Sequence, residues 1–461
     1  MPLHSRQPAT SLRVIPREQH AITRRNISQA ALRVLYRLRD AGFEAYLVGG
    51  AVRDLLLGGH PKDFDVATNA TPEEVRGLFR NSRLIGRRFR LAHVVFGSET
   101  IEVATFRGSE DDGSGDRHVV EGRLVRDNVY GTIEQDALRR DFRVNALYYD
   151  IADFSVRDYV GGMEDLERRV LHLIGDPEQR YREDPVRMLR AVRLAAKLGF
   201  TIDPAAAAPF AALGDLLGSA APARLFDECL KLFLAGHAAA SFVELERSGL
   251  LRHLFPATAD ALAHPGRGAG LRALILRGLE NTDRRLAEDK SVTPAFLFAL
   301  LLWAPVQARA EQTIAAGSDS SAAWLRAMQQ VIAAQTDHVA IPRRFTIAME
   351  DVWTLQPRFE QRVKKRVHRL LAHPRFRAAF DFLVLRGEVD PAARELAGWW
   401  QRAQQLEHAE LVELLNATAA GATAAAAPAK EAAPARKRRR RRRKPGGGSS
   451  SGGGADAPES S

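Results

Sequence analysis

The sequence predicts an α+β protein in which a head with a mixed β-sheet and helices precedes a large all-α neck and body and a disordered basic C-terminal tail. Three patterns support this prediction. Residues 26–175 alternate short apolar strands with short helices, whereas residues 185–415 place apolar residues three and four positions apart. Residues 436–444 contain only Arg and Lys, and such a run has no apolar surface to bury.

The composition of the chain excludes several classes of protein. Its 461 residues and 45% hydrophobic content are typical of a globular protein of about three domains, not of a disordered or fibrous one. The single cysteine, Cys229, excludes a disulfide scaffold and a Cys-based zinc site. The longest strongly apolar run, residues 295–304, is about half as long as a membrane span, and residues 1–30 contain no apolar signal segment. We therefore expect a cytoplasmic protein without membrane contact.

Local patterns divide the chain further. We expect a flexible N-terminus (1–25), a catalytic head (26–175), a helical neck (176–235), a helical body (236–415) and a disordered tail (416–461). Apolar runs predict strands at 45–48, 62–67, 93–96, 100–106, 147–151 and 156–160, the last two forming a hairpin. Capping residues and helix stops predict helices at 27–38, 51–57, 71–80, 136–146 and 185–199. Gly, Ser and Asp predict a mobile loop at 108–117.

The basic run in the tail dominates the charge of the chain. The formal net charge is +11, and the run from residue 436 to residue 444 supplies most of it. We expect this run to contact the phosphates of a nucleic acid with a strong salt dependence. The alternative is a solvated tail without a selected partner. The residues expected to bind nucleic acid here, RNA if the resemblance described below holds, are Arg436, Lys437, Arg438, Arg439, Arg440, Arg441, Arg442, Arg443 and Lys444.

Three carboxylates in the head predict a metal site. Asp63 and Asp65 are two residues apart on an expected strand, so both side chains would lie on one face. A third, Glu102, stands between apolar residues of another expected strand. Because like charges held this close repel, a hard divalent cation such as Mg²⁺ would remove the conflict. Such a site suits two-metal phosphoryl transfer.

The segment before these carboxylates predicts a phosphate-binding turn. Gly49 and Gly50 follow an expected strand and open an expected helix. Glycine lets the backbone approach a phosphate, and a helix N-terminus favours an anion. Arg53, one turn into the helix, would clamp a triphosphate.

In this order, the motifs of residues 45–200 resemble those of the class II nucleotidyltransferase family, which contains tRNA nucleotidyltransferases and bacterial poly(A) polymerases. The segment RRDFRVNALYYD (139–150) is similar to the family's ribose-binding motif, which implies that Arg140, Asp141 and Asn145 contact the incoming nucleotide. VGGMEDL (160–166) resembles the family's hinge between head and neck. Whether Glu102 or Asp141 completes the acidic trio stays open.

The segment YREDPVRMLRAVRLAAKLGF (181–200) resembles the family's base-reading helix. Asp184 and Arg187 are three apart, so on one helix they would share a face, and together they offer an acceptor and a rigid donor fork for a base. The alternative is that Asp184 and Arg187 form an ordinary ion pair on the protein surface. The resemblance adds Arg190 to the nucleotide-binding residues.

Within the family, RLIGRRFRLAHVVFG (83–97) and four body segments (222–236, 293–303, 341–346 and 373–383) are similar to bacterial poly(A) polymerases. The resemblance implies a template-independent enzyme that adds AMP from ATP to RNA 3′ ends, with Mg²⁺ as cofactor, and so promotes RNA decay. The basic tail would also offer a site for RNA-decay proteins. The alternatives are a CCA-adding tRNA nucleotidyltransferase, a catalytically silent basic RNA-binding protein, and a nucleic-acid-compacting protein built around the tail.

Some aromatic and titratable residues carry a weaker signal. Phe345, Trp353, Phe359 and Phe376 lie among basic residues, so they would either stack on RNA bases or, as we favour, pack between helices. His93 and Cys229 occupy apolar segments, and we expect both to be core residues without a catalytic role.

Overall fold

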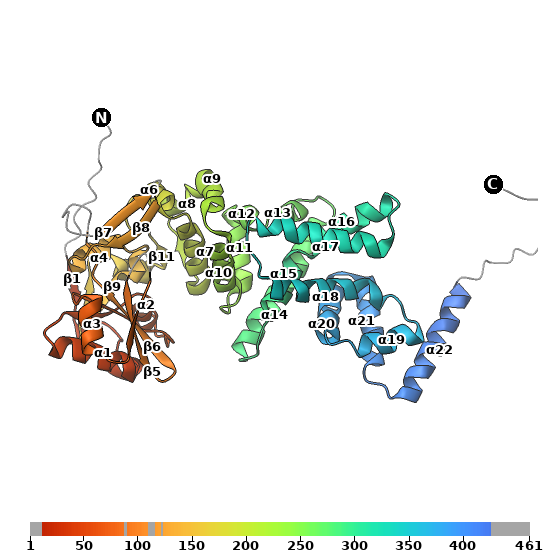
Figure 1. Ribbon diagram of the computed structural model, residues 1–461, viewed down its shortest axis with the longest axis horizontal. Coiled ribbons are helices and arrows are strands. Elements are labelled where there is room, and N and C mark those ends of the chain that lie inside the picture. The colour runs from red at the N-terminus through yellow and green to blue at the C-terminus, as the bar shows by residue number, and fades with distance from the viewer. Residues whose placement is uncertain (1–11, 87–89, 109–115, 121–122, 426–461) are drawn as a thin grey trace, which may run out of the picture. The chain divides into compact units, whose positions relative to one another are not determined.

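The computed structural model describes residues 12–86, 90–108, 116–120 and 123–425 (Figure 1). The head is a mixed sheet with helices, and from α6 onwards the chain is almost wholly helical, which confirms the predicted fold class. The expectations for residues 1–11, for most of the predicted loop and for the basic run at 436–444 fall outside the described residues. The chain divides into two compact units, residues 1–406 and 407–461, and α22 (His408–Ala425) is the described part of the second.

An eight-stranded sheet forms the centre of the head. Its strand order is β1 (Arg13–Ile15), β10 (Val156–Asp158), β9 (Leu147–Asp150), β2 (Ala45–Val48), β3 (Asp65–Thr68), β6 (Glu99–Thr105), β5 (Leu91–Phe96) and β4 (Ser82–Ile85). Within this sheet β3 and β6 run parallel, and every other neighbouring pair is antiparallel. A separate hairpin contains β7 (Asp116–Val120) and β8 (Arg123–Asn128).

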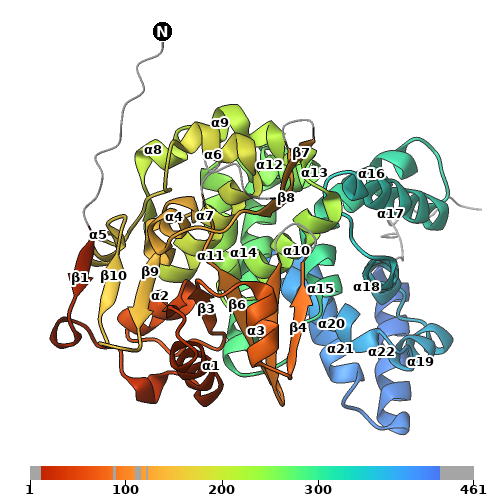
Figure 2. The same cartoon turned by 60° about the vertical axis from the view of Figure 1, so that its left-hand side comes forward.

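The two faces of the sheet have different covers. Helices α1 (Gln29–Asp40) and α3 (Pro72–Leu78) contact one face, where Leu47, Val66 and Val103 are buried (Figure 2). Helix α4 (Ile133–Arg139) belongs to the core of the other face, with Ala67 and Tyr148. Because strand residues alternate between faces, Asp65 lies on the same face as Ala67. That face carries the candidate site.

Several head elements differ from the prediction. Strand β3 begins at Asp65, so Asp63 lies in the loop before the strand and is exposed; the prediction that both carboxylates share one strand was wrong. The segment 13–15 is not frayed, because it pairs with β10 at the edge of the sheet. Helix α4 ends at Arg139, and a 3₁₀ turn at Arg143–Asn145 replaces the expected continuation.

The capping residues predicted at the start of α3 are confirmed. Thr71 Oγ1 accepts a hydrogen bond from the Glu74 backbone N–H at 3.3 Å.

The neck and body consist of helices packed in sequence. A short parallel pair, β11 (Val170–Leu171) and β12 (Thr201–Ile202), follows α5 (Gly162–Arg168). The helices are α6 (Pro177–Glu183), α7 (Val186–Leu198), α8 (Pro204–Ala207), α9 (Phe210–Leu213), α10 (Pro222–Phe233), α11 (Ala238–Arg247), α12 (Leu251–Leu254), α13 (Pro256–Leu262), α14 (Gly268–Ala287), α15 (Pro294–Leu301), α16 (Trp303–Ala315), α17 (Ser320–Thr336), α18 (Arg343–Phe359), α19 (Lys364–Leu371), α20 (Phe376–Val389) and α21 (Pro391–Ala403).

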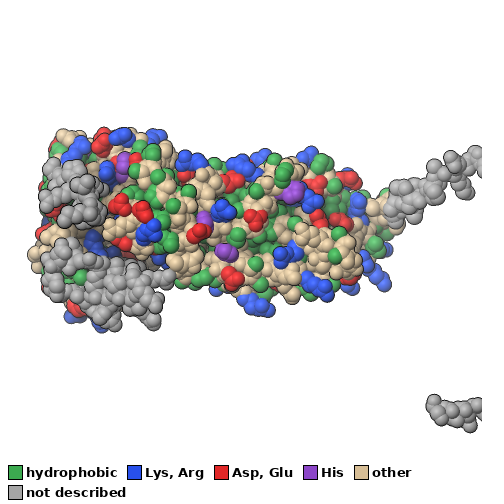
Figure 3. Space-filling view, turned by 90° about the horizontal axis from the view of Figure 1, so that it is seen from above, with side chains coloured by type: hydrophobic (Ala, Val, Ile, Leu, Met, Phe, Trp, Pro, Cys, Tyr) green, Lys and Arg blue, Asp and Glu red, His purple; other side chains and the backbone are tan. Residues whose placement is uncertain are grey.

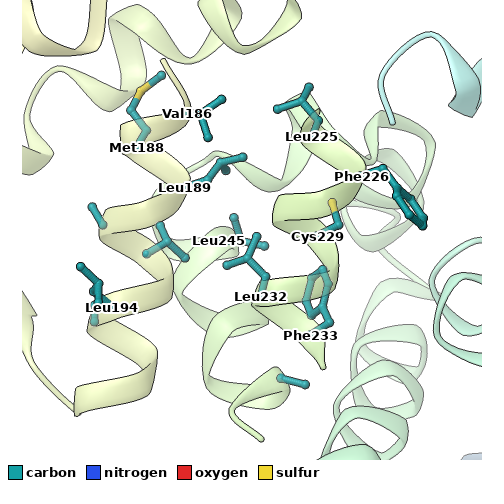
Figure 4. Packing of buried hydrophobic residues seen from close by; sticks show 14 of the residues in the cluster. Val186, Met188, Leu189, Leu194, Leu225, Phe226, Cys229, Leu232, Phe233 and Leu245 are labelled. Atoms are coloured by element: carbon teal, nitrogen blue, oxygen red, sulfur yellow. The ribbon is translucent and has the colours of Figure 1, made fainter. Parts of the chain in front are cut away.

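The core of the neck lies between α7, α10 and α11 (Figure 4). Leu189 from α7 lies against α10, which contributes Leu232, and α11 contributes Leu245. Cys229 is fully buried in this cluster, and burial raises the pKa of its thiol, as expected for a core residue. The cluster therefore fixes α7, the predicted base-reading helix, against the rest of the neck.

Three of the four body aromatics are packing residues. Trp353 and Phe359 are completely buried and Phe376 nearly so. The Trp353 indole N–H donates to the carbonyl of Ala299 at 3.0 Å, which joins α18 to α15. The packing interpretation is confirmed for these residues, since a buried ring cannot stack on RNA. None of the described helices is long and apolar enough to cross a lipid bilayer.

Truncation of the neck core tests this packing. Leu189→Ala removes a fully buried side chain and leaves a cavity, so we expect a loss of about 2–5 kcal/mol in unfolding free energy. The matched control is Val243→Ala on α11, where 40% of the residue is exposed, and its effect should stay below about 0.5 kcal/mol. Urea denaturation followed by circular dichroism measures both. Equal effects of the two variants would contradict the assignment of this core.

Candidate active site

The turn between β2 and α2 (Gly50–Leu56) brings the first site residues together. Gly49 has a φ of +75°, a conformation that residues with a Cβ rarely adopt. A Cβ atom at Gly49 would lie 3.5 Å from Asp65 Oδ2 and 3.8 Å from Arg140 Nη1. The backbone of the Gly49-Gly50 turn thus runs directly beside a carboxylate and a guanidinium.

The parallel register of β3 and β6 places Asp65 opposite Glu102. Both side chains therefore leave the sheet on the same face. Burial, reinforced by the negative charges of Glu102 and Asp63 and partly offset by Arg140, raises the pKa of the Asp65 carboxyl to about 6. Glu102 is half exposed and lies 3.1 Å from His93 Nε2. His93 therefore faces the site and not the apolar core, contrary to the prediction.

The carboxylates suit a divalent metal in their chemistry. All offer hard oxygen donors, and the raised pKa of Asp65 shows that its negative charge is not fully compensated by the protein. Among the described residues, no group of three or more His, Cys, Asp and Glu side chains is already gathered as a metal site. Asp63 is exposed on the loop before β3, and its charge helps to raise the pKa of Asp65.

The predicted triphosphate clamp, Arg53, is buried in the head. Its Nη1 atom donates to Asn145 Oδ1 at 2.6 Å, and its Nη2 atom lies 2.6 Å from Asp54 Oδ1. Its Nε atom also donates to Asp54 Oδ1, at 2.8 Å. Arg53 thus joins α2 to the 3₁₀ turn that carries Asn145, and all three of its nitrogen atoms are already engaged. The Arg53 guanidinium packs against the Gly49-Gly50 turn, because a Cβ atom at Gly50 would lie 3.4 Å from Arg53 Nη2.

Arg140, and not Arg53, has a donor atom beside the glycine turn that makes no hydrogen bond to the residues that the structure describes. Its Nε atom donates to Asp136 Oδ2 at 3.1 Å and to the Tyr148 hydroxyl at 2.9 Å, and its Nη2 atom donates to Asp136 at 2.9 Å. The Tyr148 hydroxyl in turn donates to Asp136 at 2.6 Å. These bonds do not involve Nη1, the atom nearest Gly49, so that donor remains directed at the glycine turn.

Asp141 belongs to the junction between head and neck. Its Oδ2 atom lies 2.6 Å from Arg190 Nη2 on α7, and its Oδ1 atom accepts the Phe142 backbone N–H at 2.9 Å and, weakly, the Asn145 amide at 3.5 Å. Although burial opposes ionisation, the Arg190 guanidinium and these hydrogen bonds hold the pKa of the Asp141 carboxyl below its ordinary value. Glu102 lies opposite Asp65 in the strand register, whereas Asp141 is paired with Arg190, and this placement favours Glu102 as the third member of the acidic trio.

The expected base-reading pair is not one helical pair. Asp184 is the residue that ends α6, and Arg187 lies in the first turn of α7, so they do not share a helical face as predicted. The two oxygens of Asp184 accept from the two Nη atoms of Arg224 on α10, at 2.9 and 2.7 Å. Arg187 Nη1 donates to the Arg180 carbonyl at 2.7 Å and to Glu183 at 3.0 Å.

Sequence reasoning missed four residues that organise this region: Asp136, Tyr148, Arg180 and Arg224. Arg180 Nη2 donates to the carbonyls of Arg139 and Arg140 at 2.8 Å each, which ties α6 to the backbone of the predicted ribose motif. The Asp136–Arg140 pair does follow a local spacing, four residues, which could have pointed to an ion pair. The carbonyls bound by Arg180 and the carboxylate bound by Arg224 lie 40 or 41 residues away, so no local pattern marks these two arginines. Tyr148 would not stand out either, since aromatic residues are common in strands.

The glycine turn, Asp65 and Glu102 lie together on one face of a mixed sheet, and the arginine-rich junction with α7 joins this head to the neck. The comparisons with known proteins identify the class of this domain. The family models match in three places: "Poly A polymerase head domain" at residues 45–172, "Probable RNA and SrmB- binding site of polymerase A" at 199–262, and "Polymerase A arginine-rich C-terminus" at 316–445.

Full-length relatives identify the family. Poly(A) polymerase I of Salmonella typhi is 51% identical over 410 residues, which are 87% of this chain and 88% of the relative. The chain therefore belongs to the bacterial poly(A) polymerase I family and is a nucleotidyltransferase. Members of this family generally use a divalent metal.

The CCA-adding enzymes are more distant relatives. The enzyme of Lactobacillus helveticus is 38% identical, but over only 46% of this chain and 51% of its own. Among solved structures, the Bacillus stearothermophilus CCA-adding enzyme in complex with CTP superimposes with a TM-score of 0.54 at 27% identity, covering 80% of this chain and 81% of its own. This chain thus shares its fold with the CCA-adding enzymes over most of its length, whereas the sequence similarity covers only about half of it.

The raised pKa of Asp65 gives a stability prediction. A carboxyl whose folded-state pKa of about 6 exceeds its ordinary value of 3.8 lowers stability as it ionises, so the cost grows above about pH 4 and is complete above about pH 6. In metal-free buffer at pH 7.5, Asp65→Asn should therefore melt at a higher temperature than the wild type, and the difference should vanish below about pH 4.

Magnesium should reverse this order. Added Mg²⁺ should raise the melting temperature of the wild type but not of Asp65→Asn. Asp260→Asn, which changes an exposed carboxylate on α13, is the control and should behave like the wild type in both series. A wild type that is more stable than Asp65→Asn without metal at pH 7.5 would show that the carboxylate is compensated in some other way.

Proposed function

We propose that this protein is a template-independent polynucleotide adenylyltransferase that adds AMP from ATP to RNA 3′ ends. The observation that carries the proposal is the close placement of Asp65, Glu102 and the Gly49-Gly50 turn in a chain that belongs to the bacterial poly(A) polymerase I family. In this reaction the RNA 3′-hydroxyl attacks the α-phosphate of ATP, and pyrophosphate leaves.

The head residues would divide this work among them. Asp63, Asp65 and Glu102 would hold Mg²⁺, which when bound supplies positive charge to the attacking and leaving oxygens. The backbone of Gly49 and Gly50 would lie against the triphosphate. The Nη1 donor of Arg140, directed at this turn, is better placed than the buried Arg53 to bind a phosphate oxygen.

The junction between head and neck would hold the ribose and the base. Asp141 and Asn145, hydrogen bonded to each other, would contact the ribose, with Arg190 orienting Asp141. Arg187 would donate to an acceptor on the base edge. Both oxygens of Asp184 already accept from Arg224, and Oδ1 also accepts the Val186 backbone N–H, so only part of the acceptor capacity of Asp184 is left for a donor on the base. The Asp184–Arg224 pair would hold the base pocket in one arrangement, and a fixed pocket would favour one nucleotide, ATP.

The rest of the chain would bind RNA without reading its sequence, because phosphate contacts carry no sequence information. The basic run at 436–444 and the body would serve this purpose, and the tail could also receive RNA-decay proteins. We place the activity in the cytoplasm, where 3′ adenylation would promote RNA decay. The partial sequence match to CCA-adding enzymes and the full-length match to poly(A) polymerase I weigh against the tRNA-repair alternative. The intact acidic pair weighs against a silent RNA-binding protein.

Primer extension tests the activity. Purified full-length protein, Mg²⁺, a generic single-stranded RNA and ATP should yield long tails, whereas CTP should yield little product. Asp65→Ala should reduce the rate by at least about 10³-fold, because a carboxylate that holds the metal cannot be replaced by a methyl group. Asp260→Ala serves as the control. Addition of C, C and A to a trimmed tRNA, with no extension of the generic RNA, would instead establish a CCA-adding enzyme.

Release of Asp184 tests base selection. Arg224→Ala removes the charge-assisted pair that occupies both carboxylate oxygens. We expect the ratio of kcat/KM for ATP to that for CTP to fall by about tenfold or more, because the freed carboxylate can then accept from other bases. Arg252→Ala, an exposed arginine on α12, is the control. An unchanged ratio with normal activity would show that Arg224 does not set selectivity.

A further inference from the structure

The helical body contains a basic groove between α17, α18 and α19. It encloses about 650 Å³ and is lined by Trp324 and Met328 from α17, Arg358 from α18, Arg366 and Arg369 from α19, and His373 just beyond α19. We name it the α17–α19 groove. No Asp or Glu is among the residues that line it.

The arginines of the groove are exposed and lack acidic partners. Among the described residues, no ion pair involves Arg358, Arg366 or Arg369, and Arg366 donates only to the neutral Gln361 side chain, at 2.5 Å. Arg377 on α20, outside the groove, is paired instead, 3.1 Å from Asp381. The positive charge of the groove is therefore left for a ligand.

The α17–α19 groove also has an apolar side. Trp324 is half-buried and stacks on Trp303, with ring centroids 5.4 Å apart and an angle of 23° between the rings. Met328, below it, accepts a weak hydrogen bond from the Thr354 hydroxyl at 3.8 Å. Met328 is itself buried, so the indole of Trp324 is the ring that a base could meet. A half-buried indole beside three guanidinium groups matches the two parts of a nucleotide, a flat base and a charged phosphate.

A second cavity of the body differs in its charge. This cavity, of about 740 Å³ between α13, α14, α16 and α20, is lined by Arg267 and Arg386 but also by Glu311 and Asp390. Carboxylates at these positions repel phosphate. On the face of the molecule in Figure 3, basic and acidic side chains are interspersed. The α17–α19 groove is thus better suited to phosphate than this larger cavity.

We propose that the α17–α19 groove binds the backbone of the RNA strand whose 3′ end is extended, with phosphates on Arg358, Arg366 and Arg369 and a base near Trp324. Lys364 and Lys365, exposed on the same helix as Arg366, extend the positive surface along α19. The identity of the strand as the substrate rests on the proposed adenylyltransferase function, whereas the groove's affinity for single-stranded RNA does not.

A salt titration of RNA binding tests the groove. Full-length Arg366→Ala/Arg369→Ala is compared with Arg33→Ala/Arg326→Ala, a double variant of equal charge whose exposed arginines lie on α1 and α17 outside the groove. Binding of a labelled single-stranded RNA is measured without ATP. Each lost phosphate contact lowers the slope of log K against log salt by about 0.7, so the groove variant should lose about 1.4 and the control nothing. Because every protein compared contains the basic tail, its contribution to the salt slope is the same in each and does not affect the difference.

A second readout does not depend on substitutions. RNA that contains 4-thiouridine should crosslink, on irradiation of the wild-type protein, to peptides within residues 320–373. A groove variant with the salt slope of the control, or crosslinks that fall only outside residues 320–373, would overturn the proposal.

Activity separates this proposal from the proposed function. In the enzyme assay the groove variant should raise KM for RNA about tenfold or more and leave KM for ATP unchanged. If the wild type shows no adenylyl transfer while the salt slopes still differ, the function fails and the RNA groove stands. If adenylyl transfer is normal and the slopes are equal, the groove fails and the function stands.

Discussion

The site depends on the way in which α7 is held between the head and the neck. One side of this helix is apolar and is buried against α10 and α11, whereas the other carries cations that reach acids on different elements. Arg190 lies 2.6 Å from Asp141 and Lys197 lies 2.9 Å from Asp54, both in the head. Partly exposed ion pairs contribute little stability singly, but their geometry is specific. Apolar burial therefore supplies the stability of α7, and the ion pairs determine which head residues it meets.

Ionisation of the Asp65 carboxyl is unfavourable in the folded head, and this carboxyl lies at the proposed active site. The register of β3 and β6 sets Asp65 beside Glu102, and the pKa of Asp65 rises because the carboxyl is buried and because Glu102 adds a second negative charge. Asp136, in contrast, is bonded to Arg140 and Tyr148, and its pKa is held low despite burial. Asp65 lies at the proposed metal site, and its raised pKa is what we expect if a cation completes that site.

The arginines proposed to bind nucleotide and those proposed to bind RNA differ in their protein partners. At the neck the arginines are already engaged by protein partners, as Arg224 is by Asp184, and such pre-organised groups suit the selection of one small substrate. In the α17–α19 groove they are exposed and without acidic partners, which suits a polymer that must bind and move. The charge partners of an arginine, more than its presence, thus distinguish the two kinds of surface.

The sequence by itself determined the fold class, most elements of the head and the identity of the glycine turn and acidic residues, because strand periodicity, capping boxes and motif order are local signals. It placed β2 correctly and named Asp65 and Glu102. Only the tertiary structure decided that Asp63 precedes β3, that Arg53 is buried while Arg140 faces the turn, and that Asp184 pairs with Arg224. Those facts depend on contacts between residues far apart in the chain, and no local pattern encodes which of many arginines a given carboxylate will meet.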